Sequence, residues 1–244
     1  MHSSAAKNFK HFIEVYAKSF SSRNDIRLLE IGSYDANGSL RSIAPSSFEY
    51  IGVDFCEGPG VDIVLNDPYV LPFESESVDI VVSTSCFEHS EMFWILFLEI
   101  MRVLKPSGLF YLQVPSNGTF HQYPVDCWRF YPDSGKALSA WGKRNSYKCA
   151  LIESYTSLQD FDIWNDYVAV FIKDELELFR FPERILERKL DITNGLIFGS
   201  NDYINFTSRP EDIVKYHGIL RIICNKIKYR LGIRPKYKSY GPSE

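Results

Sequence analysis

The apolar residues near the N-terminus recur with the spacing of a helix. Five of them occupy positions i, i+3, i+4, i+7 and i+11 and therefore share one helical face: Phe9, Phe12, Ile13, Tyr16 and Phe20. Most charged residues of this stretch fall elsewhere. We predict an amphipathic helix within residues 1–23 that packs on the main domain. The alternative is that this helix covers the mouth of a ligand site.

Beyond this helix, short aliphatic runs alternate with longer stretches of helical pattern. The runs predict strands at residues 27–31, 48–54, 61–65, 78–83, 109–114, 148–155 and 167–172. Helices are predicted at 90–104 and, with Asp133 as the N-cap, up to about residue 143. The segment Phe55–Gly60 is too short and too rich in turn formers to form a helix between the second and third strands. This order predicts one doubly wound α/β sheet over residues 24–174.

The remaining residues, 175–244, are predicted to form a helical and basic C-terminal extension. Residues 174–190 have the pattern of a charged helix kinked at Pro182, 191–210 that of a loop, and 213–231 that of a basic amphipathic helix. The last helix suits an anionic membrane surface, a partner subunit such as a second copy of the chain, or the chain's own acidic body. The sequence leaves these three alternatives open.

Charge is divided unevenly along the chain. Residues 213–244 hold eight basic residues and one acidic residue, a balance of +7, whereas the whole chain carries −4. The first 212 residues therefore carry −11. Such an acidic main domain argues against a general nucleic-acid-binding surface.

Composition is otherwise ordinary for a globular protein, with 45% hydrophobic and 24% charged residues. No apolar run reaches the roughly 18 residues of a membrane span, and the N-terminus lacks the apolar core of a secretory signal. The five cysteines are scattered and include no C-x-x-C pair. We therefore expect reduced thiols in a cytoplasmic protein rather than disulfides or a zinc site.

The segment 28–40 has the features of a ligand-binding loop. A predicted strand ends near Glu30, and Gly32 and Gly38 punctuate the polar residues that follow. Small residues at this point let the backbone approach a nucleotide-type ligand. The next strand ends in Asp54, where a carboxylate can accept hydrogen bonds from both ribose hydroxyls. A nicotinamide dehydrogenase would need three close glycines, and the loop does not have them.

Five segments in a fixed order resemble the class I S-adenosylmethionine-dependent methyltransferases, of the type 11 kind. The resemblance covers roughly residues 25–175 and is carried by 28–32 (LLEIG), 50–54 (YIGVD), 66–73 (NDPYVLPF), 78–82 (VDIVV) and 102–108 (RVLKPSG). It implies a Rossmann-like, doubly wound, mostly parallel seven-stranded sheet. Residues 121–133 (HQYPVDCWRFYPD) also resemble a subgroup often associated with bacterial surface-polysaccharide genes.

The resemblance implies S-adenosyl-L-methionine as the cofactor. Its methionine half would lie on the loop after the first strand, its ribose on the acid that ends the second strand, and its adenine near the Asn-Asp-Pro turn. The cofactor residues so implied are Glu30, Gly32, Ser33, Tyr34, Asn37, Gly38, Asp54, Phe55, Asn66, Asp67, Pro68 and Ser85. The loop departs from the family because residues 33–37 are bulkier than its usual glycines. For Asp67 and Pro68 the alternative is a simple turn.

A hydroxyl acceptor needs a group that removes its proton, because the neutral hydroxyl is a poor nucleophile. His89 follows the fourth strand and His121 the fifth, so either can reach the expected position of the methyl group. The alternative for each histidine is a structural role. Aromatic and hydrogen-bonding residues after the fifth strand suit a sugar ring; the candidates are Tyr123, Asp126, Trp128 and Arg129. Their alternative is that Trp128 packs under the loop while Asp126 and Arg129 pair to brace it.

We expect an S-adenosylmethionine-dependent methyltransferase that O-methylates a sugar, a glycan or another small hydroxyl compound. The alternatives are methyl transfer to the nitrogen or carboxylate of another small metabolite, and a non-catalytic, methyltransferase-like binding or scaffold subunit. No set of metal ligands is evident from spacing along the sequence.

Overall fold

The computed structural model describes residues 3–20, 23, 25–36, 38–158, 164–188, 191–211 and 227. Two compact units divide the chain, Met1–Thr207 and Ser208–Glu244. The basic helix predicted at 213–231 lies outside the described residues except for Ile227. The sheet and the site both belong to the first unit.

One sheet of eight strands organises this unit, in the order β3-β2-β1-β4-β5-β7-β6-β8. The strands are β1 (Arg27–Ile31), β2 (Glu49–Asp54), β3 (Ile63–Val64), β4 (Val78–Thr84), β5 (Leu104–Pro115), β6 (Ala150–Ser157), β7 (Asp166–Ile172) and β8 (Ile192–Ile197). Strands β1 to β5 pair in parallel, whereas β7 is antiparallel to β5 and β6, and β8 is antiparallel to β6. The sheet is therefore mixed rather than wholly parallel.

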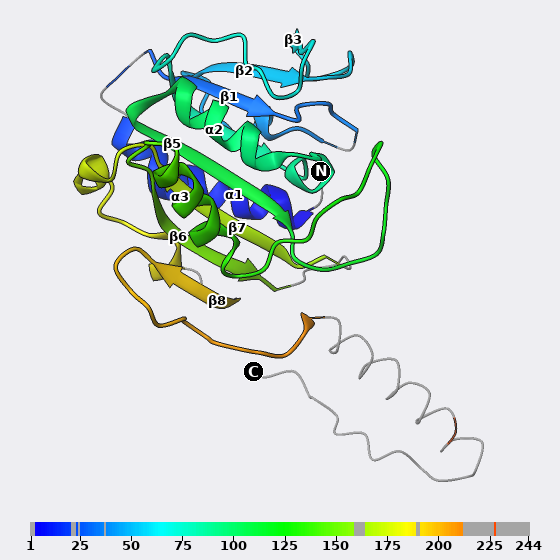
Figure 1. Ribbon diagram of the computed structural model, residues 1–244, viewed down its shortest axis with the longest axis vertical. Coiled ribbons are helices and arrows are strands. Elements are labelled where there is room, and N and C mark those ends of the chain that lie inside the picture. Colours follow the sequence, from blue (N-terminus) through cyan, green and yellow to red (C-terminus); the bar gives the residue numbers. More distant parts are fainter. Residues whose placement is uncertain are drawn as a thin grey trace, which may run out of the picture. The chain divides into compact units, whose positions relative to one another are not determined.

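Helices flank the sheet on both faces (Figure 1). The α-helices are α1 (Ser3–Tyr16), α2 (Phe93–Val103) and α3 (Ser134–Arg144). Shorter 3₁₀ helices are η1 (Ala17–Phe20), η2 (Leu40–Ser42), η3 (Phe87–His89), η4 (Glu175–Arg180) and η5 (Ile185–Glu187). Among the described residues, none of these helices has both the length and the apolar character required to cross a bilayer.

The sheet has eight strands, one more than the seven predicted. The segment 191–210, predicted as a loop, contributes β8, which pairs with β6 at the edge of the sheet. The charged helix predicted at 174–190 is also wrong, because η4 and η5 form there, on either side of Pro182. The prediction that no helix separates the second and third strands is confirmed, since a turn leads directly into β3.

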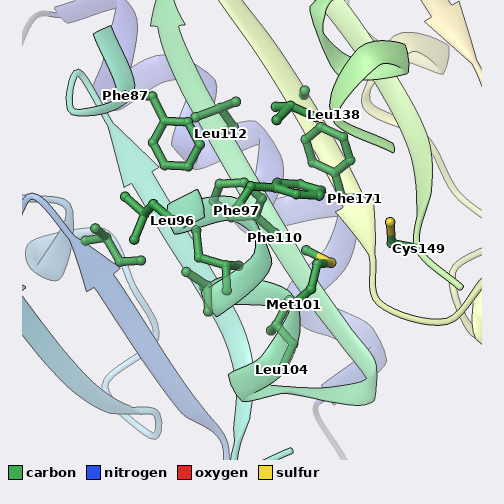
Figure 2. Packing of buried hydrophobic residues seen from close by; sticks show 14 of the residues in the cluster. Phe87, Leu96, Phe97, Met101, Leu104, Phe110, Leu112, Leu138, Cys149 and Phe171 are labelled. Atoms are coloured by element: carbon green, nitrogen blue, oxygen red, sulfur yellow. The ribbon is translucent and has the colours of Figure 1, made fainter. Parts of the chain in front are cut away.

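Alternation along the strands builds a core on each face. Phe110 and Leu112 of β5 face α2 and α3, whereas the intervening Tyr111 faces α1. On the α2 side, the ring of Phe97 lies 6.0 Å from that of Phe110 and 5.3 Å from that of Phe171 (Figure 2). Helix α3 begins after Asp133, as predicted. The predicted capping hydrogen bond of this side chain is not formed, and the carboxylate instead accepts a hydrogen bond from the Tyr203 hydroxyl.

The N-terminal helix docks on the opposite face, as its pattern predicts. Phe9 and Phe12 are fully buried, and their ring centroids lie 5.7 and 4.8 Å from that of Tyr111. The side of α1 that the sequence marks as apolar is thus used for packing on the sheet.

A buried carboxylate ties this helix to the far end of the sheet. Glu153 of β6 accepts a hydrogen bond from the Tyr16 hydroxyl at 2.5 Å. It also accepts from the backbone N–H groups of Ile185 at 2.8 Å and Leu186 at 3.0 Å. Burial raises the pKa of Glu153, against the opposing effect of these donors. The carboxyl group therefore links α1, β6 and η5 at one buried point.

Substitution Tyr16→Phe removes one donor of this link and leaves the ring in place. We expect the free energy of unfolding to fall by about 1–3 kcal/mol in urea denaturation. The control is Tyr131→Phe, because this side chain is exposed and should change the value by no more than about 0.5 kcal/mol. Equal losses in the two variants would contradict the role of Glu153.

Candidate active site

The loop after β1 is held tightly against its neighbours. The N–H groups of Gly32 and Ser33 both donate to the carbonyl of Val53, at 3.0 and 3.2 Å. Gly32 has φ +80, and a Cβ at this position would lie 2.7 Å from the Cβ of Cys86. Only glycine therefore allows this backbone to lie so close to the segment that follows β4.

Asp54 fixes the next residues of the loop. One carboxylate oxygen accepts from the N–H of Tyr34 at 3.1 Å and the other from the N–H of Cys56 at 3.0 Å. The residue is buried at 8% exposure. A carboxylate has about four acceptor positions, so two remain for the ribose hydroxyls of the cofactor. Asp54 thus fits the role that the family resemblance implies.

The turn between β2 and β3 supports the same loop. A Cβ at Gly58 would lie 2.2 Å from an atom of the Tyr34 ring, so this ring lies directly on the turn. Tyr34 and Phe55 remain 36% and 49% exposed. Their flat faces are therefore accessible to an aromatic ligand such as adenine.

The remaining candidate cofactor residues differ in their surroundings. Asp67 is exposed between exposed Asn66 and Pro68, and its Oδ1 accepts from the N–H of Tyr69 at 2.8 Å. It therefore forms a turn, and the turn leaves the residue accessible. Gly38 has φ +119, and its N–H donates to Asp35. Asn37 lies outside the described residues.

Ser33 and Ser85 lie at opposite sides of the Gly32 contact. Ser33 is buried, and its hydroxyl has no hydrogen-bond partner among the residues that the structure describes. A buried hydroxyl without a partner is unfavourable, and a bound ligand can supply one. Ser85 is exposed with φ 52, and its N–H donates to the carbonyl of Gln113.

Glu30 is partnered by protein groups. Its Oε2 accepts from the Tyr50 hydroxyl at 2.7 Å. Burial raises the pKa of Glu30 to about 7, although this hydrogen bond acts in the opposite direction. The residue is thus tied to β2 at the strand end where the cofactor is expected.

A second group of ionisable side chains gathers where β4 ends. Glu88 and His89 lie in η3, and His121 comes from the loop after β5. One potential ligand atom from each of the three residues lies within 4.8 Å of the others. The two imidazole centroids are 5.0 Å apart with their planes at 86°. The sequence offered the two histidines as alternatives, and the structure brings them together.

Backbone contacts hold this cluster to the loop formed by residues 116–133. The carbonyl of Glu88 accepts from the N–H groups of Cys127 and Trp128, at 2.8 and 3.2 Å. Nδ1 of His89 forms a short hydrogen bond with the carbonyl of Val125. Figure 1 shows this loop, in green, extending on the side of the sheet where β1 and β2 end. The loop is therefore attached to the exit of β4 at three points.

Asp126 organises the interior of the loop. Its carboxylate accepts from Nη1 and Nη2 of Arg129, at 2.5 and 2.8 Å, and from the backbone N–H of His121 at 2.7 Å. The Asp126 side chain is only 2% exposed. Hydrogen bonds from Arg129 lower the pKa of Asp126 to about 2. These contacts match the bracing alternative for the pair, and direct contact with an acceptor remains a prediction.

The two aromatic candidates differ in exposure. Tyr123 is 57% exposed, with its ring centroid 6.4 Å from that of His89 and 6.5 Å from that of Tyr34. It therefore stands between the loop after β1 and the histidines. Trp128 is 37% exposed; its Nε1 donates to the carbonyl of Ser90, and its ring packs against Phe93.

Glu88 is the member of this cluster that the sequence analysis did not predict as a site residue. It is 1% exposed, and its Oε2 has no hydrogen-bond partner within the described part of the chain. Burial raises the pKa of Glu88 to about 8, and burial lowers that of His89. The signal available in the sequence was a carboxylate directly before His89, in the polar segment that follows the fourth predicted strand.

Comparison with known proteins identifies the part of the chain that carries this site. Residues 31–112, from the end of β1 through most of β5, match the family described as a methyltransferase domain. This segment is therefore similar to methyltransferase domains. It includes Asp54, Asp67 and the Glu88–His89 pair, but ends before His121.

Relatives with assigned names match over limited stretches. A probable phthiotriol/phenolphthiotriol dimycocerosates methyltransferase 2 of Mycobacterium ulcerans is 32% identical over 96 residues, covering 34% of this chain and 37% of its own. The phthiotriol/phenolphthiotriol dimycocerosates methyltransferase of Mycobacterium leprae is 28% identical over 116 residues, covering 41% and 42%. The chain thus spans about two fifths of the length of these relatives.

Solved structures show the same fold. The 1,6-didemethyltoxoflavin-N1-methyltransferase of Burkholderia thailandensis, solved with 1,6-didemethyltoxoflavin and S-adenosylhomocysteine, superposes with a TM-score of 0.53 at 15% identity, covering 71% of this chain and 80% of that one. The [4+2]-cyclase SpnF gives 0.50 at 12% identity, covering 68% and 81%. At 15% and 12% identity these two structures show the fold, and the domain match shows that residues 31–112 are similar to methyltransferase domains.

Substitution Gly32→Ala tests the close contact after β1. Gly199→Ala is the matched control, because Gly199 also has positive φ but nothing lies within 4 Å of its added Cβ. Both variants should lose roughly 1–2 kcal/mol of stability from backbone strain. Gly32→Ala should lose about 1–3 kcal/mol more, from overpacking against Cys86. Thermal denaturation that ranks the two variants equally would contradict this contact.

The pKa of Glu30 predicts a pH dependence of stability. Because the folded state binds this proton more tightly than the unfolded state does, the stabilisation is complete below the ordinary value of 4.5 and is lost as pH rises through about 7. We expect the free energy of unfolding of the wild type, relative to Glu30→Gln, to fall by on the order of 2 kcal/mol between pH 5 and 8. Urea denaturation across this range measures it. Parallel curves for the two proteins would show that Glu30 titrates normally.

Proposed function

We propose that the chain transfers a methyl group from S-adenosyl-L-methionine to a hydroxyl of a small acceptor, a sugar or glycan in particular. The relatives' names give phthiotriol or phenolphthiotriol dimycocerosates as the compounds they methylate. From these names our proposal uses only the general class of acceptor, a compound that carries hydroxyl groups. The proposal for a sugar rests on the residues of the loop 116–133.

The observation that carries this proposal is the meeting of His89 and His121 beside Glu88. All three lie at the exit of β4, next to the loop after β1 that is expected to hold the methionine half of the cofactor. A hydroxyl needs a proton acceptor to react, and positioned acid–base groups typically contribute about 10²–10⁴-fold. An acceptor that needs no deprotonation would have no use for such a cluster.

The proposed residue roles are those that the family resemblance implies, and the positions of the residues are compatible with them. Asp54 holds the ribose, Phe55 and Asp67 border the adenine, and the turn at Gly32 leaves room for the methionine half. When bound, the cofactor supplies a methyl group already activated for direct displacement. When no metal ion is bound, an imidazole of the cluster takes the acceptor's proton. Correct alignment of the nucleophile can supply effective molarities of about 10⁵–10⁸ M.

The acceptor is proposed to lie against Tyr123. This ring is exposed next to His89, and its flat apolar face suits the carbon-bound face of a sugar ring. Trp128, Asp126 and Arg129 shape the loop around it, and the partly exposed edge of Trp128 extends the surface. The acceptor would thus be enclosed between the loops that follow β1 and β5.

Two other functions remain as alternatives. Methyl transfer to nitrogen or a carboxylate would use the same cofactor site. A methyltransferase-like scaffold would use neither site catalytically, and its basic extension, 213–231, would contact a partner subunit or a membrane. For location we propose the cytoplasm, because Cys56 and Cys127 are exposed free thiols among the described cysteines.

The cofactor and base assignments are tested separately. Calorimetry with S-adenosylhomocysteine should show one site per chain in the wild type and weaker binding in Asp54→Ala. With labelled S-adenosylmethionine and a panel of sugars, His121→Ala should reduce kcat by about 10²–10⁴-fold. S-adenosylhomocysteine should still bind to this variant as it does to the wild type.

The matched control is His11→Ala, because His11 lies on α1 outside the cluster and should retain full turnover. Absence of binding heat with either form of the cofactor would reject both enzyme hypotheses. Undiminished turnover in both His89→Ala and His121→Ala would reject the acid–base role. Methylation of amines but not of hydroxyl compounds would favour the first alternative function.

A further inference from the structure

We propose that Glu88, His89 and His121 bind a divalent transition-metal ion of the Zn²⁺ type, with a coordination position left for the acceptor's hydroxyl oxygen. The metal site stands on the geometry of these residues alone. Only the role of the bound hydroxyl rests on the proposed function. A metal ion bound here would activate the acceptor's hydroxyl group in place of the imidazole that takes its proton in the metal-free protein.

The three side chains provide a suitable set of ligands in a suitable volume. Two imidazole nitrogens and one carboxylate oxygen lie within 4.8 Å of one another. Zinc bonds to such atoms measure roughly 2.0–2.2 Å, so tetrahedral ligands on one ion stand about 3.3–3.6 Å apart. The three side chains must therefore approach one another by about 1 Å to bind an ion. Three protein ligands of this type leave at least one position open.

The surroundings of His89 fix which nitrogen can bind a metal. Its Nδ1 faces the carbonyl of Val125, so Nδ1 must carry the hydrogen. The lone pair then lies on Nε2, which is 3.7 Å from Oε1 of Glu88. A metal-binding histidine typically donates its other N–H to a carbonyl or a carboxylate in this way. When Glu88 is ionised, two electron-pair donors face each other, and a cation stabilises this arrangement.

His121 has the same kind of support. Its Nδ1 lies 3.3 Å from Oδ2 of Asp126 and 3.3 Å from the carbonyl of Thr119. Both neighbours are acceptors, which favours hydrogen on Nδ1 and a lone pair on Nε2. Nη2 of Arg129 is also 3.5 Å from Nδ1, but it already donates to both of these oxygens. Asp126 thus acts as a positioning residue behind His121.

Glu88 supplies an independent indication of a ligand. Its side chain is 2% exposed, yet Oε2 has no hydrogen-bond partner among the described residues. A buried carboxylate oxygen without a partner is unfavourable, and a bound cation satisfies it directly. Neighbouring Arg129 makes its own hydrogen bonds to Asp126 rather than to Glu88.

Ligand chemistry selects the class of ion. Two imidazoles with one carboxylate suit zinc and neighbouring first-row ions, whereas magnesium and calcium prefer oxygen ligands. The His121 side chain is 38% exposed, so the open side of the site is accessible from solvent. The exposed ring of Tyr123 borders this side, where the acceptor is proposed to lie.

A bound cation would change how the acceptor is activated. The hydroxyl oxygen coordinates the ion and its proton leaves to solvent water, because the imidazole lone pairs are occupied by the metal. The oxygen lone pair then forms the new O–CH₃ bond while the S–CH₃ bond breaks and its electron pair returns to sulfur. Charge and atoms balance without an oxidant or reductant.

Cobalt titration of the full chain tests the site. Co²⁺ should bind at one ion per chain and give visible absorption bands that Zn²⁺ abolishes by competition. His121→Ala should weaken binding by more than about 10-fold, and Asp126→Asn should weaken it by about 10–100-fold through the loss of its positioning contact. His11→Ala is the matched control and should bind cobalt as the wild type does.

Folding and cofactor binding are monitored in the same proteins with S-adenosylhomocysteine calorimetry. Equal cobalt binding in the wild type and His121→Ala, or no cobalt bands in a wild type that binds the cofactor, would overturn the metal site. Cobalt binding with methyl transfer unaffected by a chelator would overturn its role in activating the hydroxyl. Failure of cofactor binding with normal cobalt binding would instead reject the proposed function and leave the metal site supported.

Discussion

The candidate site depends on the Asp126 carboxylate more than on any other group. It is buried in a loop, where it is paired with Arg129 and accepts the backbone N–H of His121. A buried charge is tolerated only when it is paired and hydrogen-bonded, so the loop must adopt the path that satisfies this carboxylate. That path places His121 next to His89. Without it, the exit of β4 would hold a single histidine beside Glu88.

The sheet supplies the fixed frame to which this loop is attached. Strands β1, β2 and β4 run in parallel, so their carboxyl ends bring Gly32, Asp54 and Glu88 to one edge. Helix α1 packs on the opposite face from α2 and anchors the far side of the sheet through Glu153. The fold thus separates the proposed cofactor side, built on the ends of β1 and β2, from the proposed acceptor side, built on η3 and the loop after β5.

The parts that follow local rules were predictable from the sequence. Periodicity located β1, β2, β4 and β7 almost to the residue, and the acid ending β2 is where the pattern placed it. Strand β8 was missed because Asn194 and Gly195 are turn formers, and pairing with β6 overrides that preference. Residues 175–180 look helical in charge pattern, but Pro182 follows and Phe181 and Ile185 are buried in the core with α1. The cluster could not be predicted, because the path of residues 116–133 is set by non-local bonds such as that from Cys127 to Glu88.

We propose that the cofactor lies between the loop after β1 and Asp54, with its sulfur directed toward Glu88, His89 and His121. A crystal structure of the chain with S-adenosylhomocysteine tests this arrangement. We expect ribose hydroxyls hydrogen-bonded to Asp54, adenine beside Phe55 and Asp67, and the sulfur facing the two histidines across the space next to Tyr123. A cofactor bound at this edge with its sulfur turned away from the histidines, or bound elsewhere on the chain, would rule the arrangement out.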